Sequence, residues 1–161
     1  MENIISNFKL SDGTIVRCNF FDTNGTSRYR GVNESYYKKV DCCIIVYDIT
    51  DRNSFDEIQT YYIPLINQKC QKDIPILIIG NKTDLDEKRE ILTEQGEELA
   101  LNYNYIFKET SSINNSNILD IFQEIIENTV YKVKEEEKIN ENRRLIRIND
   151  YNNERKCFHL C

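Results

Sequence analysis

Features that mark secreted, membrane-spanning and metal-binding proteins are missing from this chain of 161 residues. No apolar run approaches the roughly 20 residues that a membrane-spanning helix needs. The first residues hold no basic segment followed by an apolar core, so we expect no signal peptide. None of the six cysteines forms a C-x-x-C pair, which argues against a structural zinc site. Without a secretory signal, we expect reduced thiols rather than disulfides.

The charge balance and the composition narrow the class further. The formal net charge is −6, which disfavours a nucleic-acid backbone as the main partner, so we expect no nucleic-acid binding. Hydrophobic residues make up 40% of the chain and charged residues 30%, as in ordinary soluble domains. The single histidine, His159, is expected to be an ordinary tail residue. We find no internal repeat, and we expect one monomeric domain.

Predicted strands alternate with predicted helices from residue 40 onward. Short apolar runs predict buried strands, and apolar residues at helical spacing predict helices between them. The expected strands are 40–49, 74–79 and 105–107. One helix begins at about Asn53, capped by Asn53 or Ser54 and kinked or ended at Pro64, and two further helices are capped by Thr93 and by Ser116. This alternation predicts an α/β fold with a parallel sheet and helices on both faces. Near the start, Asp12-Gly13 predicts a hairpin that adds an antiparallel edge strand.

The character of the sequence changes at Lys132. Residues 1–131 carry the strand and helix patterns, whereas apolar periodicity fades in 132–161 and gives way to runs of Glu, Arg and Asn. We therefore expect one domain over 1–131. Over 132–161 we expect a solvated helical extension that grades into a largely disordered tail.

The segment 81–84, with the sequence N-K-T-D, directly follows the predicted strand 74–79. Ligands of open α/β sheets bind just past the carboxyl ends of such strands. A carboxylate at Asp84 can accept hydrogen bonds from the N1–H and the exocyclic amine of guanine, a donor pair that adenine lacks. The stem of Lys82 can lie over the ring, and Asn81 can brace the neighbouring loop. From these four residues alone, the alternative is a polar loop that begins with a turn-forming Asn.

Four segments stand in an order that resembles the Ras-type small GTPases, and within them the Rab branch. The segments are 21–25 (F-D-T-N-G), 45–50 (I-V-Y-D-I-T), 81–84 (N-K-T-D) and 109–112 (E-T-S-S), with Tyr29-Arg30 and Tyr36-Tyr37 as further Rab-like pairs. The resemblance implies a Ras-like P-loop NTPase fold with a mostly parallel sheet, binding of GTP and GDP, and a role in vesicle-mediated protein transport. It also implies a cytoplasmic protein that attaches peripherally to endomembranes.

The resemblance further implies roles for individual residues. The family's guanine-binding set is matched by Asn81, Lys82, Asp84, Ser111 and Ser112. Asp22 matches the carboxylate that holds Mg²⁺ through water, and Gly25 matches the glycine whose backbone N–H senses the γ-phosphate. The region 26–39 corresponds to the surface that Rab effectors and regulators contact.

Other parts of the family's pattern have no counterpart in this sequence. The phosphate loop G-x-x-x-x-G-K-[ST] and the first switch are absent, and with them the first strand and the first helix of the fold. The position of the catalytic Gln holds Thr26, so we assign no catalytic residue and leave the enzyme class open. Without the charge-assisted phosphate contacts, we expect weak binding of GTP or GDP, little Mg²⁺ binding at Asp22, and a degenerate GTPase, or pseudo-GTPase.

Three interpretations stay open at this point. The chain is a catalytically degenerate Rab-like protein, an incomplete gene model or fragment of an active Rab GTPase, or an interaction module that binds partners through Tyr29, Tyr36 and Tyr37 without nucleotide. The missing strand would be central, so its neighbours close up, another strand fills its place, or the chain folds poorly. The ending C-F-H-L-C is no C-C, C-x-C or C-a-a-X motif. Cys157 and Cys161 are therefore either prenylation sites or two exposed thiols.

Overall fold

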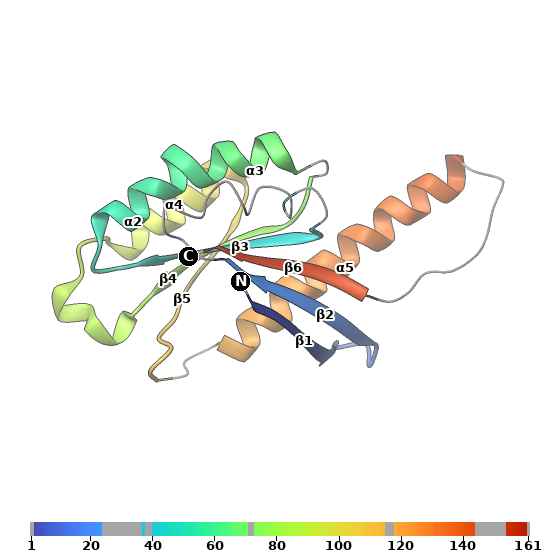
Figure 1. Ribbon diagram of the computed structural model, residues 1–161, viewed down its shortest axis with the longest axis horizontal. Coiled ribbons are helices and arrows are strands. Elements are labelled where there is room, and N and C mark those ends of the chain that lie inside the picture. The colour runs from blue at the N-terminus through green and yellow to red at the C-terminus, as the bar shows by residue number, and fades with distance from the viewer. Residues whose placement is uncertain are drawn as a thin grey trace.

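The computed structural model describes residues 2–23, 37, 40–70, 73–114, 118–143 and 154–160. They form one sheet between two helical layers (Figure 1). In chain order the elements are β1 (Glu2–Lys9), β2 (Ile15–Asp22), β3 (Cys42–Asp48), α2 (Arg52–Glu57), η3 (Ile58–Tyr62), α3 (Ile63–Lys69), β4 (Ile76–Asn81), η4 (Thr83–Lys88), α4 (Thr93–Tyr103), β5 (Ile106–Glu109), α5 (Ile118–Arg143) and β6 (Glu154–Leu160).

The sheet has six strands in the order β1-β2-β6-β3-β4-β5. β1 pairs antiparallel with β2, and every other neighbouring pair is parallel. The hairpin between β1 and β2 turns at Gly13, whose φ of 84° lies in the region that glycine adopts without strain. The predicted α/β fold, with a mostly parallel sheet and an antiparallel edge strand, is confirmed.

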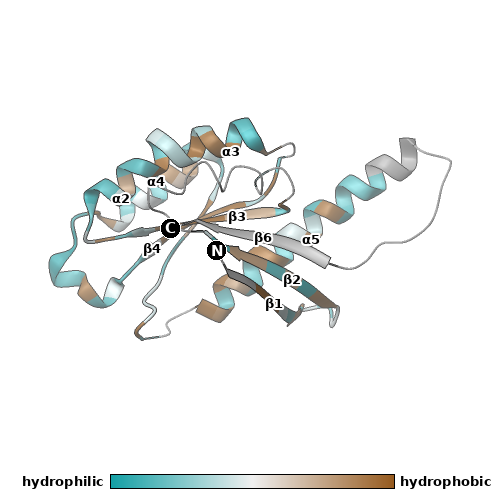
Figure 2. Cartoon of the chain, in the orientation of Figure 1, coloured by the Kyte–Doolittle hydropathy of each residue, from teal (hydrophilic) through white to brown (hydrophobic). Residues whose placement is uncertain are grey.

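Burial of β3 on both faces creates two apolar cores. Cys43, Ile45 and Tyr47 face the core that contains Phe55 of α2 and Leu99 of α4, together with residues of η3 and α3. Cys42 and Ile44 face the second core, which α5 covers. This period of two is the side-chain alternation of a strand, and a strand covered on both faces is apolar at nearly every position. Figure 2 shows most of β3 in brown, the colour of hydrophobic residues.

The helix after β3 changes its pitch near Pro64. α2 continues into the π-helical turn η3, and Pro64 lies in the first turn of α3. Proline has no N–H to donate to the carbonyl four residues earlier, and the wider turn accommodates its ring. The predicted kink at Pro64 is thus a π-helical turn, after which the helix continues.

Two predicted helix caps are wrong. The cap of α2 is Asp51, whose side chain accepts from the Asn53 N–H at 3.0 Å, rather than Asn53 or Ser54. Ser54 instead accepts the Asp48 N–H at 3.0 Å. Thr93 is the first residue of α4 rather than its cap; the N-cap is Leu92, whose N–H donates to the Gln95 side chain at 3.0 Å. The predicted cap at Ser116 lies outside the described residues.

The last part of the chain differs from the expected disordered tail. α5 runs through residue 131 to Arg143, as a helical extension, and residues 154–160 form β6 in the middle of the sheet. Another strand therefore fills the place between β2 and β3 that the sequence leaves open. The domain boundary at 131/132 stays a prediction. Within the described residues, no helix combines the length and the apolar character that crossing a membrane requires.

Candidate functional site

Two segments meet at the carboxyl ends of β4 and β5. In the parallel pairing of these strands, Gly80 is level with Glu109, so residues 81–84 and 110–112 leave the sheet side by side. Their backbones are joined directly: the Thr110 N–H donates to the Gly80 carbonyl at 2.8 Å, and the Thr83 N–H donates to the Thr110 carbonyl at 3.1 Å. This edge is where open α/β sheets bind ligands.

Asp84 and Ser111 are in direct contact at this edge. The Ser111 hydroxyl donates to Asp84 Oδ1 at 2.5 Å and accepts the Asn114 N–H at 3.2 Å. Ser111 is completely buried, so its hydroxyl is fixed in direction. The contact holds one carboxylate oxygen of Asp84 and with it the orientation of the whole group. The sequence pattern predicts these residues at one site, but it does not indicate that the serine side chain orients the carboxylate.

Asn81 joins the two segments through its side chain. Asn81 Oδ1 accepts from the hydroxyls of Thr110 and Ser112, each at 3.3 Å. These bonds tie the two segments together, and the role of Asn81 in guanine binding stays a prediction. Thr110, which is 5% exposed, was not among the predicted site residues. Its position between two predicted site segments was the signal that could have identified it.

Lys82 reaches along the carboxyl edge of the sheet to the end of β3. Its backbone is left-handed, with φ 70° and ψ 36°, a conformation that costs of order 1 kcal/mol in a residue with a Cβ and that often occurs at functional sites. Its ammonium pairs with Asp48 Oδ2 at 2.5 Å, while half of the Lys82 side chain stays exposed. Asp48 also accepts from the N–H and hydroxyl of Thr50, at 2.9 and 2.7 Å.

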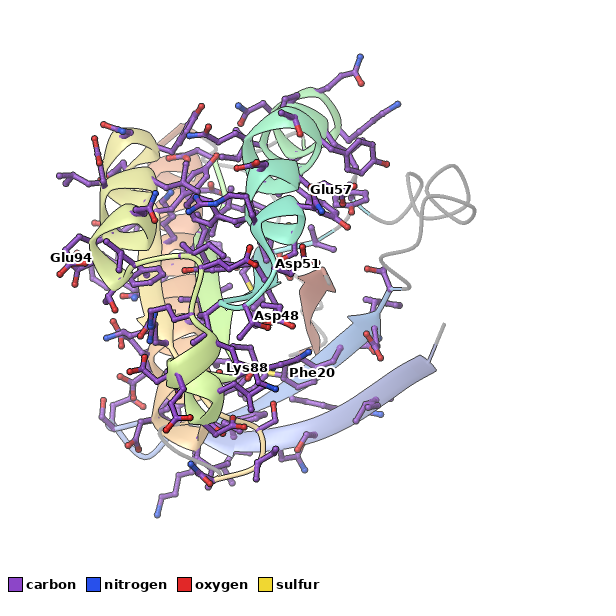
Figure 3. The ribbon with its side chains drawn as sticks, turned by 90° about the vertical axis from the view of Figure 1, so that its left-hand side faces the viewer. Phe20, Asp48, Asp51, Glu57, Lys88 and Glu94 are labelled. Atoms are coloured by element: carbon purple, nitrogen blue, oxygen red, sulfur yellow. The ribbon has the colours of Figure 1, made fainter. Side chains whose placement is uncertain are left out.

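The electrostatics of this pair favour both charges. Partial burial by itself would raise the pKa of Asp48, but hydrogen bonds from Lys82 and Thr50 outweigh it, and the pKa lies below its usual value. The hydrogen bond to Asp48 raises the pKa of Lys82. The pair is therefore ionised at neutral pH. Figure 3 shows Asp48 at the carboxyl end of its strand, with Asp51 close by at the start of α2.

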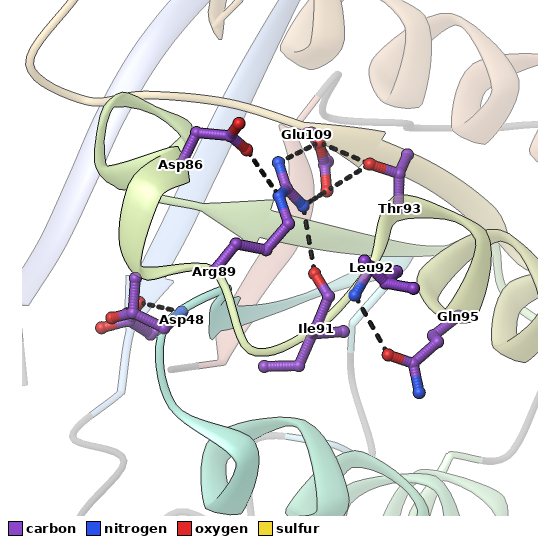
Figure 4. A network of polar contacts seen from close by, with 9 residues as sticks. Asp48, Asp86, Arg89, Ile91, Leu92, Thr93, Gln95 and Glu109 are labelled. Atoms are coloured by element: carbon purple, nitrogen blue, oxygen red, sulfur yellow. Dashed lines mark hydrogen bonds and ion pairs between the residues drawn. The ribbon is translucent and has the colours of Figure 1, made fainter.

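Arg89 fastens η4 to the end of β5 (Figure 4). Its guanidinium makes a two-pronged contact with Glu109, at 2.6 and 3.1 Å, and its Nε donates to Asp86 Oδ1 at 2.7 Å. The Thr93 hydroxyl lies 3.3 Å from both Glu109 oxygens. Hydrogen bonding to Glu109 raises the pKa of Arg89 further above its ordinary value. This network joins η4, which contains Asp84, to the end of β5, from which residues 110–112 extend. No sequence pattern indicated Arg89 as part of it.

The predicted phosphate and switch residues are only partly described. Asp22 is the last residue of β2 and is level with His159 of β6, at the same edge of the sheet as Asp48 but with β6 between their strands. Gly25, Thr26 and Cys161 lie outside the described residues. Cys157 is in β6, level with Cys42 of β3. Within the described part of the chain, no group of three or more His, Cys, Asp or Glu side chains could hold a metal ion.

One residue of the predicted partner surface is in the core. Tyr37 is 2% exposed and belongs to the apolar cluster with Cys43 and Tyr62. Its burial raises the pKa of its hydroxyl above the usual value. Tyr37 therefore cannot contact a partner in this conformation, and its predicted role in binding is wrong. Tyr29 and Tyr36 lie outside the described residues.

Comparison with known proteins places this geometry in a family. The model of the Ras family matches residues 1–131. The chain is 36% identical to the Ras-related protein Rab-37 of Homo sapiens over 121 residues, which cover 75% of this chain and 54% of the relative. It is 35% identical to Rab-8 of Diplobatis ommata over 131 residues, covering 81% of this chain and 61% of the relative. The matched part thus spans little more than half of each relative's length. From the family match and these identities, the chain belongs to the Rab branch of the Ras superfamily of small GTPases.

Proposed function

We propose that this chain binds the guanine base of GTP or GDP in a pocket formed by five residues, Asn81, Lys82, Asp84, Ser111 and Ser112. The contact between Asp84 and Ser111 is the observation that carries the proposal. It leaves Asp84 Oδ2 and the remaining lone pairs of Oδ1 to accept from a ligand. A carboxylate that is oriented before the ligand arrives loses less conformational entropy on binding.

The exposed stem of Lys82 supports the same pocket. Its ammonium is held by Asp48, and half of the Lys82 side chain is exposed. Aliphatic stems of this kind bury well against apolar surface while the charge stays outside. The face of a purine ring is such a surface. Lys82 then contributes packing, and Asp84 contributes selectivity for guanine.

Nucleotide binding is proposed to be weak and hydrolysis degenerate. In this family the phosphates and Mg²⁺ are held mainly by the phosphate loop and the first switch, which the sequence does not match. We expect little Mg²⁺ binding, because among the family's Mg²⁺ ligands this sequence matches the carboxylate, at Asp22, but not the hydroxyl ligands of the phosphate loop and the first switch. Charge-assisted contacts contribute about 1.5–3 kcal/mol each, so the loss of several lowers affinity by decades.

A titration with a fluorescent guanine nucleotide tests the pocket. In Asp84→Asn, an NH₂ group replaces one of the two carboxylate oxygens that would accept from the N1–H and the exocyclic amine of guanine. We expect at least about tenfold weaker binding. Glu87→Gln is the matched control, because it makes the same charge change on an exposed residue of the same turn, η4. Equal losses in both variants, or no loss in Asp84→Asn, would show that the guanine assignment is wrong.

A second proposal follows from the share of the relatives that the chain covers. The match spans 54% of Rab-37 and 61% of Rab-8, so a longer polypeptide that contains this chain would supply the phosphate contacts and hydrolyse GTP. Extending the chain with its upstream coding sequence and repeating the titration separates the two proposals. Binding that tightens by several decades and depends on Mg²⁺ would favour the fragment. Unchanged weak binding would favour the degenerate protein.

The partners and the location belong to the same proposal. We propose a monomer that works in vesicle traffic, contacts Rab effectors or regulators through the region 26–39 apart from Tyr37, and attaches to endomembranes by a lipid on Cys157 or Cys161. The intact mass of the protein from eukaryotic cells, compared with Cys157→Ser and Cys161→Ser variants, tests the lipid. A mass without any addition would leave two ordinary thiols and no anchor at these positions.

A further inference from the structure

The middle of the sheet is held by a strand from the last part of the chain. β6 pairs parallel with β2 from Arg17–Glu154 to Asp22–His159. On its other side it pairs parallel with β3, from Cys42–Cys157 to Ile45–Leu160. β2 and β3 do not pair with each other, so β6 provides the connection between the hairpin and the rest of the sheet.

The neighbouring strands β2 and β3 depend on β6 for their backbone partners. Cys42, Cys43, Ile44 and Ile45 of β3 are completely buried. Removing β6 would leave the backbone N–H and C=O groups on the facing edges of β2 and β3 without partners, and would uncover apolar side chains between them. The empty place would therefore have a high affinity for any extended segment.

β6 has an unusual composition for a central parallel strand. Such strands are nearly continuous apolar runs, as the sequence C-C-I-I-V-Y of β3 is. β6 begins instead with three charged residues, E-R-K, and only its residues 157–159 pair on both sides. The three charged residues are thus paired with β2 alone.

We infer that residues 154–160 form a reversible closing strand of the sheet. In the docked state the strand completes the sheet, and Cys157 lies level with Phe20 on one side and Cys42 on the other. In the released state, the edges of β2 and β3 are open and the thiol of Cys157 is accessible to modification. The two states exclude each other, because a segment bonded on both sides by backbone ladders cannot enter the site of a modifying enzyme. Docking and release of this strand do not depend on the proposed guanine binding. Attachment of a lipid to Cys157, however, would require the released state.

Hydrogen exchange in the wild-type protein tests the inference, with β4 as the internal reference. β4 pairs with β3 and β5 and has no contact in the sheet with β6, so its amides report opening of the sheet as a whole. We expect β6 amides to exchange at least about tenfold more slowly than in an unfolded chain, but at least about tenfold faster than β4 amides. Exchange of β6 at the unfolded rate would show that it does not dock. Exchange at the rate of β4 would show that it is not released separately. Either result overturns the inference.

Alkylation of Cys157 with N-ethylmaleimide provides a second readout. Phe158→Pro removes a ladder N–H from the doubly paired part of β6. This variant should bring the alkylation rate of Cys157, measured on its peptide by mass spectrometry, to the rate in guanidinium chloride while β4 stays protected. Asn149→Pro, outside the ladder, is the matched control and should leave the wild-type rate. An unchanged rate in Phe158→Pro would overturn the inference, and if that variant fails to fold, the wild-type exchange decides.

Discussion

The two sides of the carboxyl edge of the sheet are built in different ways. On the β4–β5 side, side chains of two loops bond to one another, as in the contact of Ser111 with Asp84 and the network around Arg89. On the β2–β6 side, the described connection is a backbone ladder between Asp22 and a strand with a charged start. The residues that we propose to bind guanine lie on the first side, and Asp22, which matches the family's Mg²⁺ carboxylate, lies on the second. The supports of the proposed guanine pocket are therefore local to two neighbouring strands.

Removing Arg89 is expected to have the largest effect on the β4–β5 side. In Arg89→Met, the half-buried Glu109 loses its bidentate partner, and we expect the free energy of unfolding to fall by about 3 kcal/mol. Urea unfolding measures the change. Lys108→Met is the control, because its ion pair with Glu124 is exposed on both sides and should contribute about 0–1 kcal/mol. Similar values for the two variants would mean that the network does not hold the site together.

Gly96→Ala tests how tightly α4 packs behind the same site. A Cβ on Gly96 would lie 2.4 Å from two ring atoms of Phe107 in β5 and 2.9 Å from the Tyr47 hydroxyl. Such overpacking costs about 1–3 kcal/mol, partly offset by the higher helix propensity of alanine. Thermal unfolding measures the loss, and Glu97→Ala, on an exposed position of the same helix, should have little effect. Equal midpoints would show that α4 can move away from β5 without cost.

The pH dependence of the Lys82–Asp48 pair gives a smaller effect. The pKa of Asp48 is lowered from 3.8, so its contribution is present above that value and is lost as the pH falls through the folded-state pKa. The pKa of Lys82 is raised from 10.5, so its contribution is present below that value and is lost as the pH rises through the folded-state pKa. The free energy of unfolding of the wild type should therefore exceed that of Lys82→Met by a constant amount from about pH 5 to pH 9. Because the lysine is exposed, we expect this difference to stay within about 1 kcal/mol.

Urea unfolding of both proteins across this pH range measures that difference. It should shrink below about pH 3.8 and above about pH 10.5, where one partner loses its charge. Lys88→Met, on an exposed lysine of the same turn, serves as the control for the loss of one positive charge. A Lys82→Met difference that grows steadily with pH would contradict the ion pair.

Tyr47→Phe is expected to have the smallest effect. The Tyr47 hydroxyl is buried beside Gly80 and Gly96 and has no hydrogen-bond partner among the described residues. Removing it takes away a desolvated polar group and breaks no bond, so the change should be neutral or stabilise by up to about 1 kcal/mol. Chemical unfolding measures it. A loss above 1 kcal/mol would show that the hydroxyl has a partner, such as a buried water.

The sequence was enough to place the candidate site residues next to one another, but it did not predict the helix cap and the strand described next. Asp84 and Ser111 could be placed together because parallel strands end at one edge, and this rule needs no side-chain detail. The cap at Asp51 was missed because several cap-forming residues follow one another, and tertiary contacts, here of Ser54 with Asp48, decide among them. β6 was missed because its charged start gives no strand pattern. It is a strand because two open edges accept it, and that cause lies elsewhere in the chain.

The most direct test of base recognition compares GDP, IDP and ADP in competition titrations against the wild-type protein. Inosine lacks the exocyclic amine of guanine, and adenine lacks both donors that Asp84 would accept. We predict that IDP binds about tenfold or more weaker than GDP, that ADP binds weaker still, and that the difference between GDP and IDP disappears in Asp84→Asn. Equal affinities for the three nucleotides, or no binding of any of them, would contradict the account.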